Sequence, residues 1–573
     1  MKTANRNGAQ MTTPAELYET HRELLDRAIR AATVRDYWSA FPESPSKSVY
    51  GEDAAPAGER AFTALLGKPF PIDVPGATGT VTTERSPFGL ELGVSYPKAD
   101  PLALVAAARA AMPAWRAVGP QGRAGVAAEI IKRINARSFE LAHAVQHTTG
   151  QAFVMAFQAG GTHAQDRALE AVAFALAATT RLPAEAGWVK PMRGGELRMA
   201  KSSTVVGRGV GLVIGCTTFP TWNGYPGIFA SLVTGNPVIV KPHPGAVLPL
   251  AITVQICREV LAEAGLSPDV VTLAAEEPGD GIAATLATHP DVRIVDFTGS
   301  SDFGNWLEAN ARQAVVYTEK AGLNTVLVDS TDDYKGMLRN LAFSLSLYSG
   351  QMCTTPQNIL VPQAGIETDA GHRTIEEFGA DLSAALDKLL GDPQRAAGTL
   401  GAIVNDGVLS RLTEAGNAAS VIRPSTEVTD EQYPQATIRT PVVVRLDAAD
   451  DKVYTREWFG PVSFLIATDS TAASVQIFTE TVRAHGALTA AVHTTSPDVL
   501  AAVREAALDA GVHLSENLTG GVFVNQTAAF SDLHGTGANP AATASLTDDF
   551  FVTGRFFTLQ SRHHVPAPEQ TGA

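Results

Sequence analysis

The pattern of apolar and polar positions changes character along the chain. Residues 16–33 carry apolar side chains at a spacing near 3.6 and predict a helix, and residues 101–178 are alanine-rich and mostly helical in pattern. From Gly209 onward, short apolar runs alternate with helical segments. This alternation predicts parallel sheets that are covered by helices on both faces.

Two blocks of this kind follow one another. The first block contains expected strands at residues 210–214, 237–240, 270–273, 293–297 and 314–317; the second contains them at 324–328, 358–361, 442–446, 462–466, 489–492 and 522–524. Helical patterns between them cover residues 227–234, 247–264, 334–349 and 379–390. The predicted fold class is therefore α/β, with two doubly wound α/β domains.

Two segments fit neither block. Residues 184–206 alternate as a hairpin does, and residues 550–559 predict a strand without a sheet of its own. We expect both to be edge strands that pair across a subunit boundary, with surface hairpins of a monomer as the alternative. The first hundred residues form an N-terminal extension that includes loops at residues 40–49 and 67–76.

Composition narrows the possible classes of function. The 573 residues are 45% hydrophobic and 18% charged, which excludes a disordered or coiled-coil chain. The net charge of −15 disfavours nucleic acid as a partner. The chain shows neither a secretory signal nor a run of the roughly 18 apolar residues that a membrane helix needs. We expect a soluble, cytoplasmic protein without a membrane partner.

Cysteine usage leaves one candidate nucleophile. Three cysteines are too few for a disulfide framework, and Cys216 and Cys257 are expected to be structural because they lie at a strand end and within a helix. Cys353 lies in a turn between a helix and a strand, where backbone N–H groups can stabilise a thiolate. A small buried hydrophobic side chain is the alternative interpretation of Cys353.

Other polar residues follow expected strands. Ligands of α/β proteins bind beyond the carboxyl ends of parallel strands, which makes Glu319 and Lys241 candidates for a site. The alternatives are a surface ion pair between Glu319 and Lys320, and a solvated lysine. Asn223 follows a strand and can donate an amide N–H to an oxyanion, or it can be an ordinary turn residue.

A glycine turn links an expected strand to the start of a helix at Thr298, Gly299 and Ser300. The backbone donors of such a turn attract phosphate, although plain N-capping gives the same pattern. There is no GxGxxG fingerprint. Glu457, in the sequence EWFGP, is a further candidate, with a polar turn residue as its alternative.

The histidines do not predict a metal centre. Their spacing matches no ligand motif; they include His485, His493, His513 and His534. We therefore predict no metal.

The order of these motifs resembles the aldehyde dehydrogenase superfamily over roughly residues 102–559. The resemblance rests on Trp222-Asn223, Val240-Lys241-Pro242, Phe297-Thr298-Gly299-Ser300, Glu319 before Gly322, Gly350-Gln351-x-Cys353 and Glu457-x-Phe459-Gly460-Pro461-Val462. It implies that Cys353 attacks the aldehyde and that Asn223 and the Cys353 N–H stabilise the oxyanion. It also implies that Glu319 activates water to release the acyl group, and that the chain has the fold of this superfamily with an oligomerisation β-arm.

The resemblance also implies a nicotinamide cofactor. Glu457 would hold the nicotinamide ribose beside Phe459, Gly299 and Ser300 would face the pyrophosphate, and Lys241 would face the adenosine ribose. The full set of expected cofactor residues is Trp222, Lys241, His243, Thr298, Gly299, Ser300, Glu457 and Phe459. Many members that use NAD carry a glutamate three residues after the lysine, where this chain has Pro244. Because His243 could contact a 2′-phosphate instead, we expect NADP to be preferred or accepted alongside NAD.

The N-terminal extension resembles one subgroup, the phenylacetic acid degradation protein PaaN family. The matching residues lie within 21–29, 37–47 and 67–70. This resemblance implies oxidation of a ring-opened, CoA-linked semialdehyde to its carboxylate, with a separate hydratase as a possible partner. A dehydrogenase of small free or aromatic aldehydes and a non-catalytic scaffold remain alternatives.

The resemblance divides the chain into regions. Residues 1–100 are the extension, 101–182 and 210–320 the cofactor-binding domain, and 321–540 the catalytic domain. Residues 183–209 and 541–573 are the expected oligomerisation segments of a homodimer or homotetramer.

Overall fold

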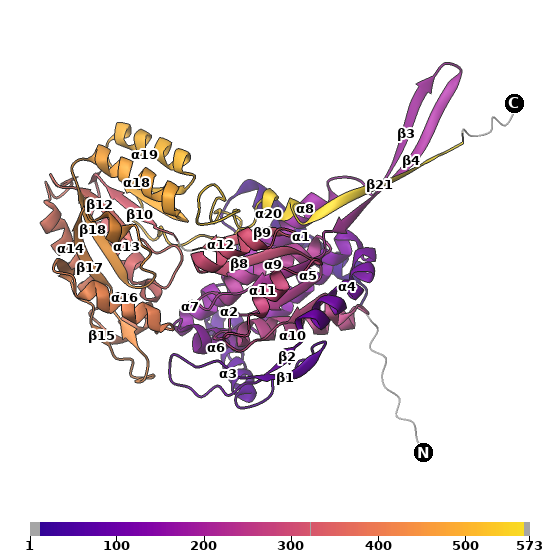
Figure 1. The fold of residues 1–573 in the computed structure, drawn as a ribbon, viewed down its shortest axis with the longest axis horizontal. Coiled ribbons are helices and arrows are strands. Elements are labelled where there is room, and N and C mark those ends of the chain that lie inside the picture. The colour runs from indigo at the N-terminus through magenta and orange to yellow at the C-terminus, as the bar shows by residue number, and fades with distance from the viewer. Residues whose placement is uncertain (1–11, 321, 567–573) are drawn as a thin grey trace.

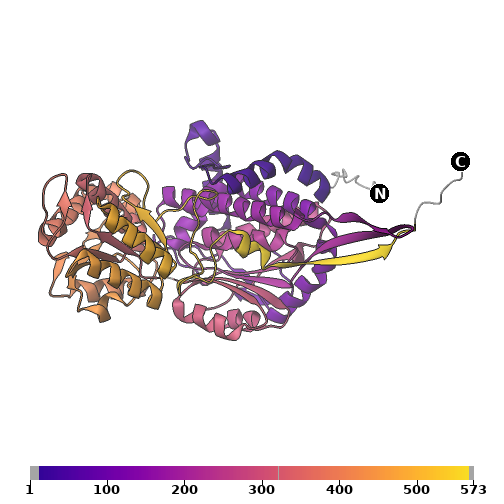
Figure 2. The same cartoon turned by 90° about the horizontal axis from the view of Figure 1, so that it is seen from above.

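Two α/β units lie side by side, and a β-arm projects from one of them (Figures 1 and 2). The structure is a computed structural model that describes residues 12–320 and 322–566. Each unit is built around its own parallel or mostly parallel sheet, as the alternation of strands and helices predicts. The fold is therefore α/β with two doubly wound units.

The first sheet has five parallel strands in the order β7-β6-β5-β8-β9. These are β5 (Val210–Ile214), β6 (Val238–Lys241), β7 (Val271–Leu273), β8 (Val292–Gly299) and β9 (Val315–Lys320). Helices α9 (Pro220–Val233), α10 (Leu248–Glu263), α11 (Ile282–Ala287) and α12 (Ser301–Asn310) connect them. The strand order reverses between β5 and β8, so the carboxyl ends of these two strands border a crevice of the kind that binds ligands.

The N-terminal extension packs onto this unit. Helix α1 (Pro14–Val34) confirms the helix predicted at residues 16–33, and a capping box between Thr13 and Glu16 begins it. Its apolar face, including the buried Leu25, joins the same core as α5. The other helices of this layer are α2 (Lys47–Tyr50), α3 (Ala54–Leu65), α4 (Pro101–Ala117), α5 (Gly119–Ala136), α6 (Ser138–Thr149), α7 (Phe153–Phe157), a π-helical turn (Gln158–His163) and α8 (Ala164–Thr180), with the strand pair β1 (Ala77–Val81) and β2 (Tyr96–Ala99).

The second sheet has seven strands in the order β14-β17-β18-β12-β10-β19-β20, and β14 alone among them runs antiparallel to its neighbour. They are β10 (Thr325–Val328), β12 (Asn358–Pro362), β14 (Val421–Arg423), β17 (Val442–Asp447), β18 (Val462–Thr468), β19 (Thr489–His493) and β20 (His513–Glu516). The helices of this unit are α13 (Tyr334–Ser346), α14 (Ile375–Leu390), α15 (Pro393–Leu400), α16 (Asp406–Gly416), α17 (Asp451–Tyr454), α18 (Thr471–His485) and α19 (Pro497–Ala510). Two short strand pairs, β11 (Ser330–Thr331) with β13 (Glu367–Thr368) and β15 (Glu427–Val428) with β16 (Ile438–Arg439), complete it.

Three predicted elements differ in the structure. Residues 522–524, predicted as a strand, have irregular backbone because the Asn340 side chain binds the carbonyl oxygen of Val522 at 2.7 Å. Strand β20 instead forms that edge of the sheet. The segment 550–559 divides into helix α20 (Asp549–Thr553), capped by Asp548, and strand β21 (Phe556–His564). Helix α9 begins at Pro220 rather than at residue 227, so it includes Trp222 and Asn223.

The β-arm consists of the antiparallel strands β21, β4 and β3. Strands β3 (Glu185–Met192) and β4 (Gly195–Gly207) confirm the hairpin predicted at residues 184–206. Arg555 anchors the base of the arm by pairing with Asp296 and is itself fully buried. Residues 541–543 lie outside the arm and against β9, where the Lys320 N–H donates to the Ala541 carbonyl at 2.6 Å. Within the described residues, no helix has both the length and the apolar character needed to cross a bilayer.

Candidate active site

Cys353 lies on a strained loop between α13 and β12. A 3-10 turn (Leu347–Gly350) precedes it, and Tyr348 and Ser349 have φ angles of 54° and 49°, in the left-handed region that non-glycine residues avoid. A Cβ at Gly350 would lie 2.4 Å from the Gly460 carbonyl oxygen. The loop that carries Cys353 is therefore pressed directly against the loop that carries Glu457.

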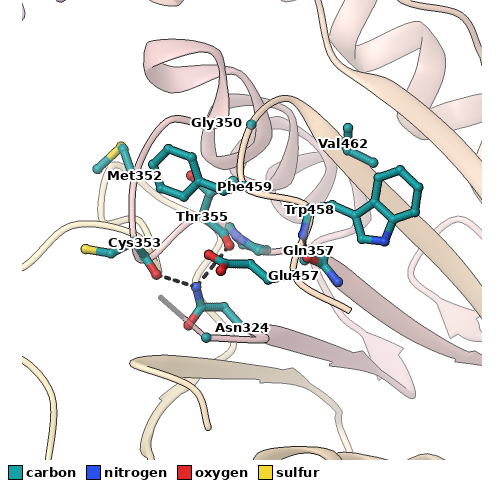
Figure 3. A pocket seen from close by; sticks show the side chains of 13 residues that line it. Asn324, Gly350, Met352, Cys353, Thr355, Gln357, Glu457, Trp458, Phe459 and Val462 are labelled. Atoms are coloured by element: carbon teal, nitrogen blue, oxygen red, sulfur yellow. Dashed lines mark hydrogen bonds between the residues drawn. The ribbon is translucent and has the colours of Figure 1, made fainter. Parts of the chain in front are cut away.

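Asn324 holds the Cys353 loop in place. Its Nδ2 donates to the carbonyl oxygens of Cys353 at 2.7 Å and Thr355 at 3.1 Å (Figure 3). Its Oδ1 accepts from the backbone N–H groups of Leu488 and Thr489. Sequence reasoning missed Asn324, although a polar residue directly before a buried strand was the available signal.

Glu319, Asn223 and Cys353 come together as predicted, and His534 joins them. Asn223 Nδ2 donates to Glu319 Oε1 at 3.0 Å, and His534 Nε2 lies 3.2 Å from the same oxygen. The donor atoms of Glu319, His534 and Cys353 all lie within 4.8 Å of one another, a spacing that also suits a metal ion and that sequence spacing did not predict. The surface ion pair considered for Glu319 is wrong, because Glu319 is buried and Lys320 pairs with Glu308.

Burial and charge set the protonation of this cluster. Burial raises the pKa of the Cys353 thiol well above its usual range, and the neighbouring Glu319 carboxylate raises it further. Burial also raises the pKa of Glu319, but the charge of His534 and hydrogen bonds from Cys353 and Asn223 outweigh it, so that this pKa is lowered overall. The resting cluster therefore pairs a neutral thiol with an ionised carboxylate.

A narrow crevice opens on one side of Cys353. Glu457 and Phe459 approach it from the loop between α17 and β18 (Figure 3), and the space enclosed is about 20 Å³. Burial raises the pKa of Glu457 to about 7, opposed by the positive charge of Arg411. Gln357 fixes this loop because its Oε1 accepts the Trp458 N–H at 2.7 Å.

The other expected cofactor residues lie at the carboxyl edge of the five-stranded sheet. Thr298 and Gly299 end β8, and Ser300 caps α12 by accepting the Phe303 N–H. Lys241 ends β6, is buried rather than solvated, and pairs with Glu276.

His243 is placed less favourably for an anionic ligand. Its Nδ1 accepts the Gly245 N–H at 3.0 Å, so the ring nitrogen nearest the backbone carries no proton. The sequence has no carboxylate three residues after Lys241. In the structure, the carboxylate of Glu276, which follows the neighbouring strand β7, lies against Lys241 instead.

A tunnel of about 510 Å³ opens on the other side of Cys353. Its walls come from the N-terminal extension, the turn after α7, the start of α9, α13 and the segment 521–534. Trp222, expected among the cofactor residues, lines this tunnel instead, because α9 begins before it. Aromatic side chains dominate the middle of the wall: Trp38, Phe219, Trp222, Phe343 and Phe523.

Comparisons with known proteins agree with this architecture. The model of the aldehyde dehydrogenase family matches residues 95–531. The chain is 56% identical to an NAD-dependent aldehyde dehydrogenase of known structure from Burkholderia multivorans, with a TM-score of 0.95 over 96% of this chain and 99% of that one. The chain therefore belongs to the aldehyde dehydrogenase family, and it is an oxidoreductase that acts on aldehydes.

More distant relatives act on different aldehydes. An N-succinylglutamate 5-semialdehyde dehydrogenase of Paraburkholderia xenovorans (strain LB400) is 29% identical over 63% of this chain and 70% of its own length. A vanillin dehydrogenase of Pseudomonas fluorescens is 27% identical over 70% of this chain and 80% of its own length.

Proposed function

We propose that the chain oxidises an aldehyde to a carboxylate through a thioester on Cys353. The Cys353 thiol loses its proton to water in the tunnel as its sulfur adds to the aldehyde carbon, and the Asn223 amide and the Cys353 N–H donate to the resulting oxyanion. A nicotinamide held beside Glu457 and Phe459 would supply the acceptor for the hydride that this carbon loses. Glu319 then takes a proton from the water that attacks the thioester, the C–S bond breaks, and the acid and the thiol sulfur are released. The observation that carries this proposal is the buried cluster of Cys353, Glu319 and Asn223 between crevice and tunnel.

The residues around the crevice fit a dinucleotide. The N-terminus of α12 offers backbone donors for a pyrophosphate, and Glu457 offers a carboxylate for ribose hydroxyls. The Lys241–Glu276 pair supports NAD as the preferred cofactor, since the Glu276 carboxylate can accept from ribose hydroxyls and repels a 2′-phosphate. NADP then binds more weakly, contrary to the preference expected from Pro244 and His243.

For the substrate we propose a ring-opened, CoA-linked semialdehyde of phenylacetate degradation, whose uncharged acyl chain would lie in the tunnel while the anionic CoA phosphates stay outside it. Among the described residues that line the tunnel there is no lysine or arginine, and its acidic members are Glu43, Asp166 and Asp532. An anionic tail is therefore disfavoured inside it. The tunnel reaches residues 37–43, within the segment that resembles the PaaN family, so this extension helps to choose the substrate.

A free aromatic aldehyde is the second candidate. The aromatic wall formed by Trp38, Phe219 and Trp222 suits a ring as well as an alkyl chain.

We further propose that the β-arm pairs protomers into a dimer or tetramer. The exposed apolar side chains of Met192 and Leu559 on this arm support that role. A separate hydratase remains a proposed partner for supplying a CoA-linked substrate.

One assay tests the proposed function. Purified protein is mixed with matched CoA-linked, aromatic, alkyl and ω-carboxylate aldehydes, each with NAD and with NADP, while reduced cofactor is followed by absorbance. We expect kcat/KM to be highest for the CoA-linked aldehyde with NAD and lowest for the ω-carboxylate series. Best activity with a free aromatic aldehyde would select the second candidate, and absence of reduced cofactor with every aldehyde would reject the proposal.

A further inference from the structure

The Glu319 carboxyl is nearly buried, so the groups around it determine how the proton that it takes reaches bulk water. Its side chain is 5% exposed at the end of β9, and residues 541–543 cover that strand end, where Glu319 forms a bridge with Ala542. Each turnover of the proposed reaction leaves on this carboxyl a proton from water. The carboxyl must lose that proton before it can act as a base again.

His534 spans the distance between Glu319 and the tunnel. Its Nε2 lies 3.2 Å from Glu319 Oε1, its Nδ1 lies 3.5 Å from the Thr527 hydroxyl, and both His534 and Thr527 line the tunnel. His534 is 4% exposed. Among the described residues, neither its Nε2 nor Glu319 Oε2 has a hydrogen-bond partner of good geometry. Two buried polar atoms without such partners commonly mark a functional site.

The loop around His534 is held firmly. The Leu546 N–H donates to the His534 carbonyl at 2.8 Å, and His513 Nε2 lies 2.8 Å from the carbonyl oxygen of Gly535. The Trp222 ring packs edge-on against the imidazole, with centroids 4.7 Å apart. The loop and Trp222 therefore place the imidazole beside the carboxylate.

Carboxylates and one guanidinium lie around the His534 ring. Glu319 faces Nε2 with a carboxylate, and Asp532 lies in the same loop and lines the same tunnel. The nearby positive charge is the Arg167 guanidinium, which lies 5.3 Å from the centroid of the Trp222 ring. Arg167 is paired with Glu170 at 2.8 Å. Cys353 and His513 are the other titratable groups near the His534 ring.

We propose that His534 relays the proton of deacylation from Glu319 to water in the tunnel. Nε2 accepts the proton from the Glu319 carboxyl, and Nδ1 gives up a proton to tunnel water, which leaves an ionised carboxylate and a neutral ring protonated on Nε2. A turn of the imidazole that lets this proton exchange with tunnel water then restores the starting tautomer for the next cycle. His534 acts through Glu319 and touches no substrate. This inference rests on the proposed function, in which Glu319 is the base.

An activated ester tests the relay without aldehyde or cofactor. p-Nitrophenyl acetate transfers its acetyl group to a reactive thiol and releases p-nitrophenolate, so a stopped-flow burst measures acylation and the later steady phase measures deacylation. We compare the wild-type protein with H534Q, H534A and a matched control, H513Q, which alters a histidine against the same loop but away from Glu319. We expect H534Q to keep the burst and to lose about 10- to 100-fold in the steady phase.

Two further readouts separate a relay from a structural role. Added imidazole should accelerate the steady phase of H534A, because the tunnel admits it, and should leave H534Q and H513Q unchanged. The H513Q variant should keep both phases within about twofold. A wild-type steady phase in H534Q, or an equal loss in H513Q without rescue by imidazole, would overturn the relay. If C353A still gave the wild-type burst, the proposed function itself would fail.

Discussion

The two sides of Cys353 are built in different ways. On one side, the crevice has a volume of about 20 Å³ and is formed by residues from three segments, 322–324, 350–357 and 457–462. On the other side, the tunnel encloses about 510 Å³ and takes its wall from segments as far apart as residues 37–43 and 521–534. The crevice is compact and is formed within the second unit, whereas the tunnel is assembled from segments of both units and of the N-terminal extension.

This difference separates two kinds of chemistry. The groups proposed to bind the cofactor sit at strand ends, where a parallel sheet always presents its ligands. The groups proposed to choose the aldehyde sit outside the sheets, on the extension, on helices α9 and α13 and on the segment 521–534. Changes on the crevice side should therefore alter cofactor parameters alone, and changes on the tunnel side should alter aldehyde parameters alone.

Replacing the group that both sides share gives the largest expected effect. C353A should lower kcat by about 10⁴-fold or more, because no other nucleophile faces the aldehyde. Binding of NAD, measured by calorimetry, should be nearly unchanged. C257A is the matched control, since Cys257 is buried in α10, and it should keep wild-type turnover. Substantial turnover by C353A would show that Cys353 is not the nucleophile shared by the crevice and the tunnel.

A change at the cofactor side comes next. E276Q removes the carboxylate beside Lys241, so the ratio of kcat/KM with NAD to that with NADP should fall by about tenfold, or ~1.4 kcal/mol. E277Q alters the adjacent glutamate, which makes no ion pair with Lys241, and should leave the ratio unchanged. Equal ratios in E276Q and the wild-type protein would show that another group discriminates the cofactors.

A change in the tunnel should alter the kinetic constants of the aldehyde and leave those of the cofactor unchanged. W38A removes an aromatic wall contributed by the extension, and should raise the KM of a long aldehyde by about 3- to 10-fold, a loss of ~1 kcal/mol of apolar contact. The KM values of acetaldehyde, which is too short to reach this wall, and of NAD are the internal controls. A rise in the KM of NAD would contradict the separation of the two sides.

The smallest expected effect is a pH dependence. Because the pKa of Glu457 is raised to about 7, this carboxyl is ionised above that pH and becomes neutral below it. The KM of NAD should therefore rise a few-fold as the pH falls from about 8 to 6. E457Q should have a KM for NAD that is higher but flat over this range. A pH dependence that persists in E457Q would assign the titration to another group.

Much of the architecture could be predicted from the sequence. The apolar runs of β5, β6, β10 and β12 are buried on both faces, so their pattern is unambiguous. The segment 522–524 has the same pattern, but a tertiary hydrogen bond from Asn340 takes up its backbone, and no local signal reveals that bond. The helix at 549–553 was hidden for a different reason, since its aromatic residues also favour strands.

The site residues also fall into two groups: those that sequence motifs predict and those that only tertiary folding brings to the site. Cys353, Glu319 and Asn223 belong to motifs and were predicted to converge, as the structure has them. His534 and Glu276 reach the site from distant segments, and no spacing in the sequence relates them to Glu319 or Lys241. Only the fold creates these pairs.

The acyl group on Cys353 is the most direct evidence that could be obtained for this account. In E319Q the base that activates water is lost, so the thioester should accumulate when the protein is mixed with hexanal and NAD. Mass spectrometry of the denatured protein is expected to show one added hexanoyl group per chain, on the peptide that contains Cys353, and none in the double variant C353A/E319Q. An unmodified Cys353 in E319Q that has formed one equivalent of NADH would contradict the thioester mechanism.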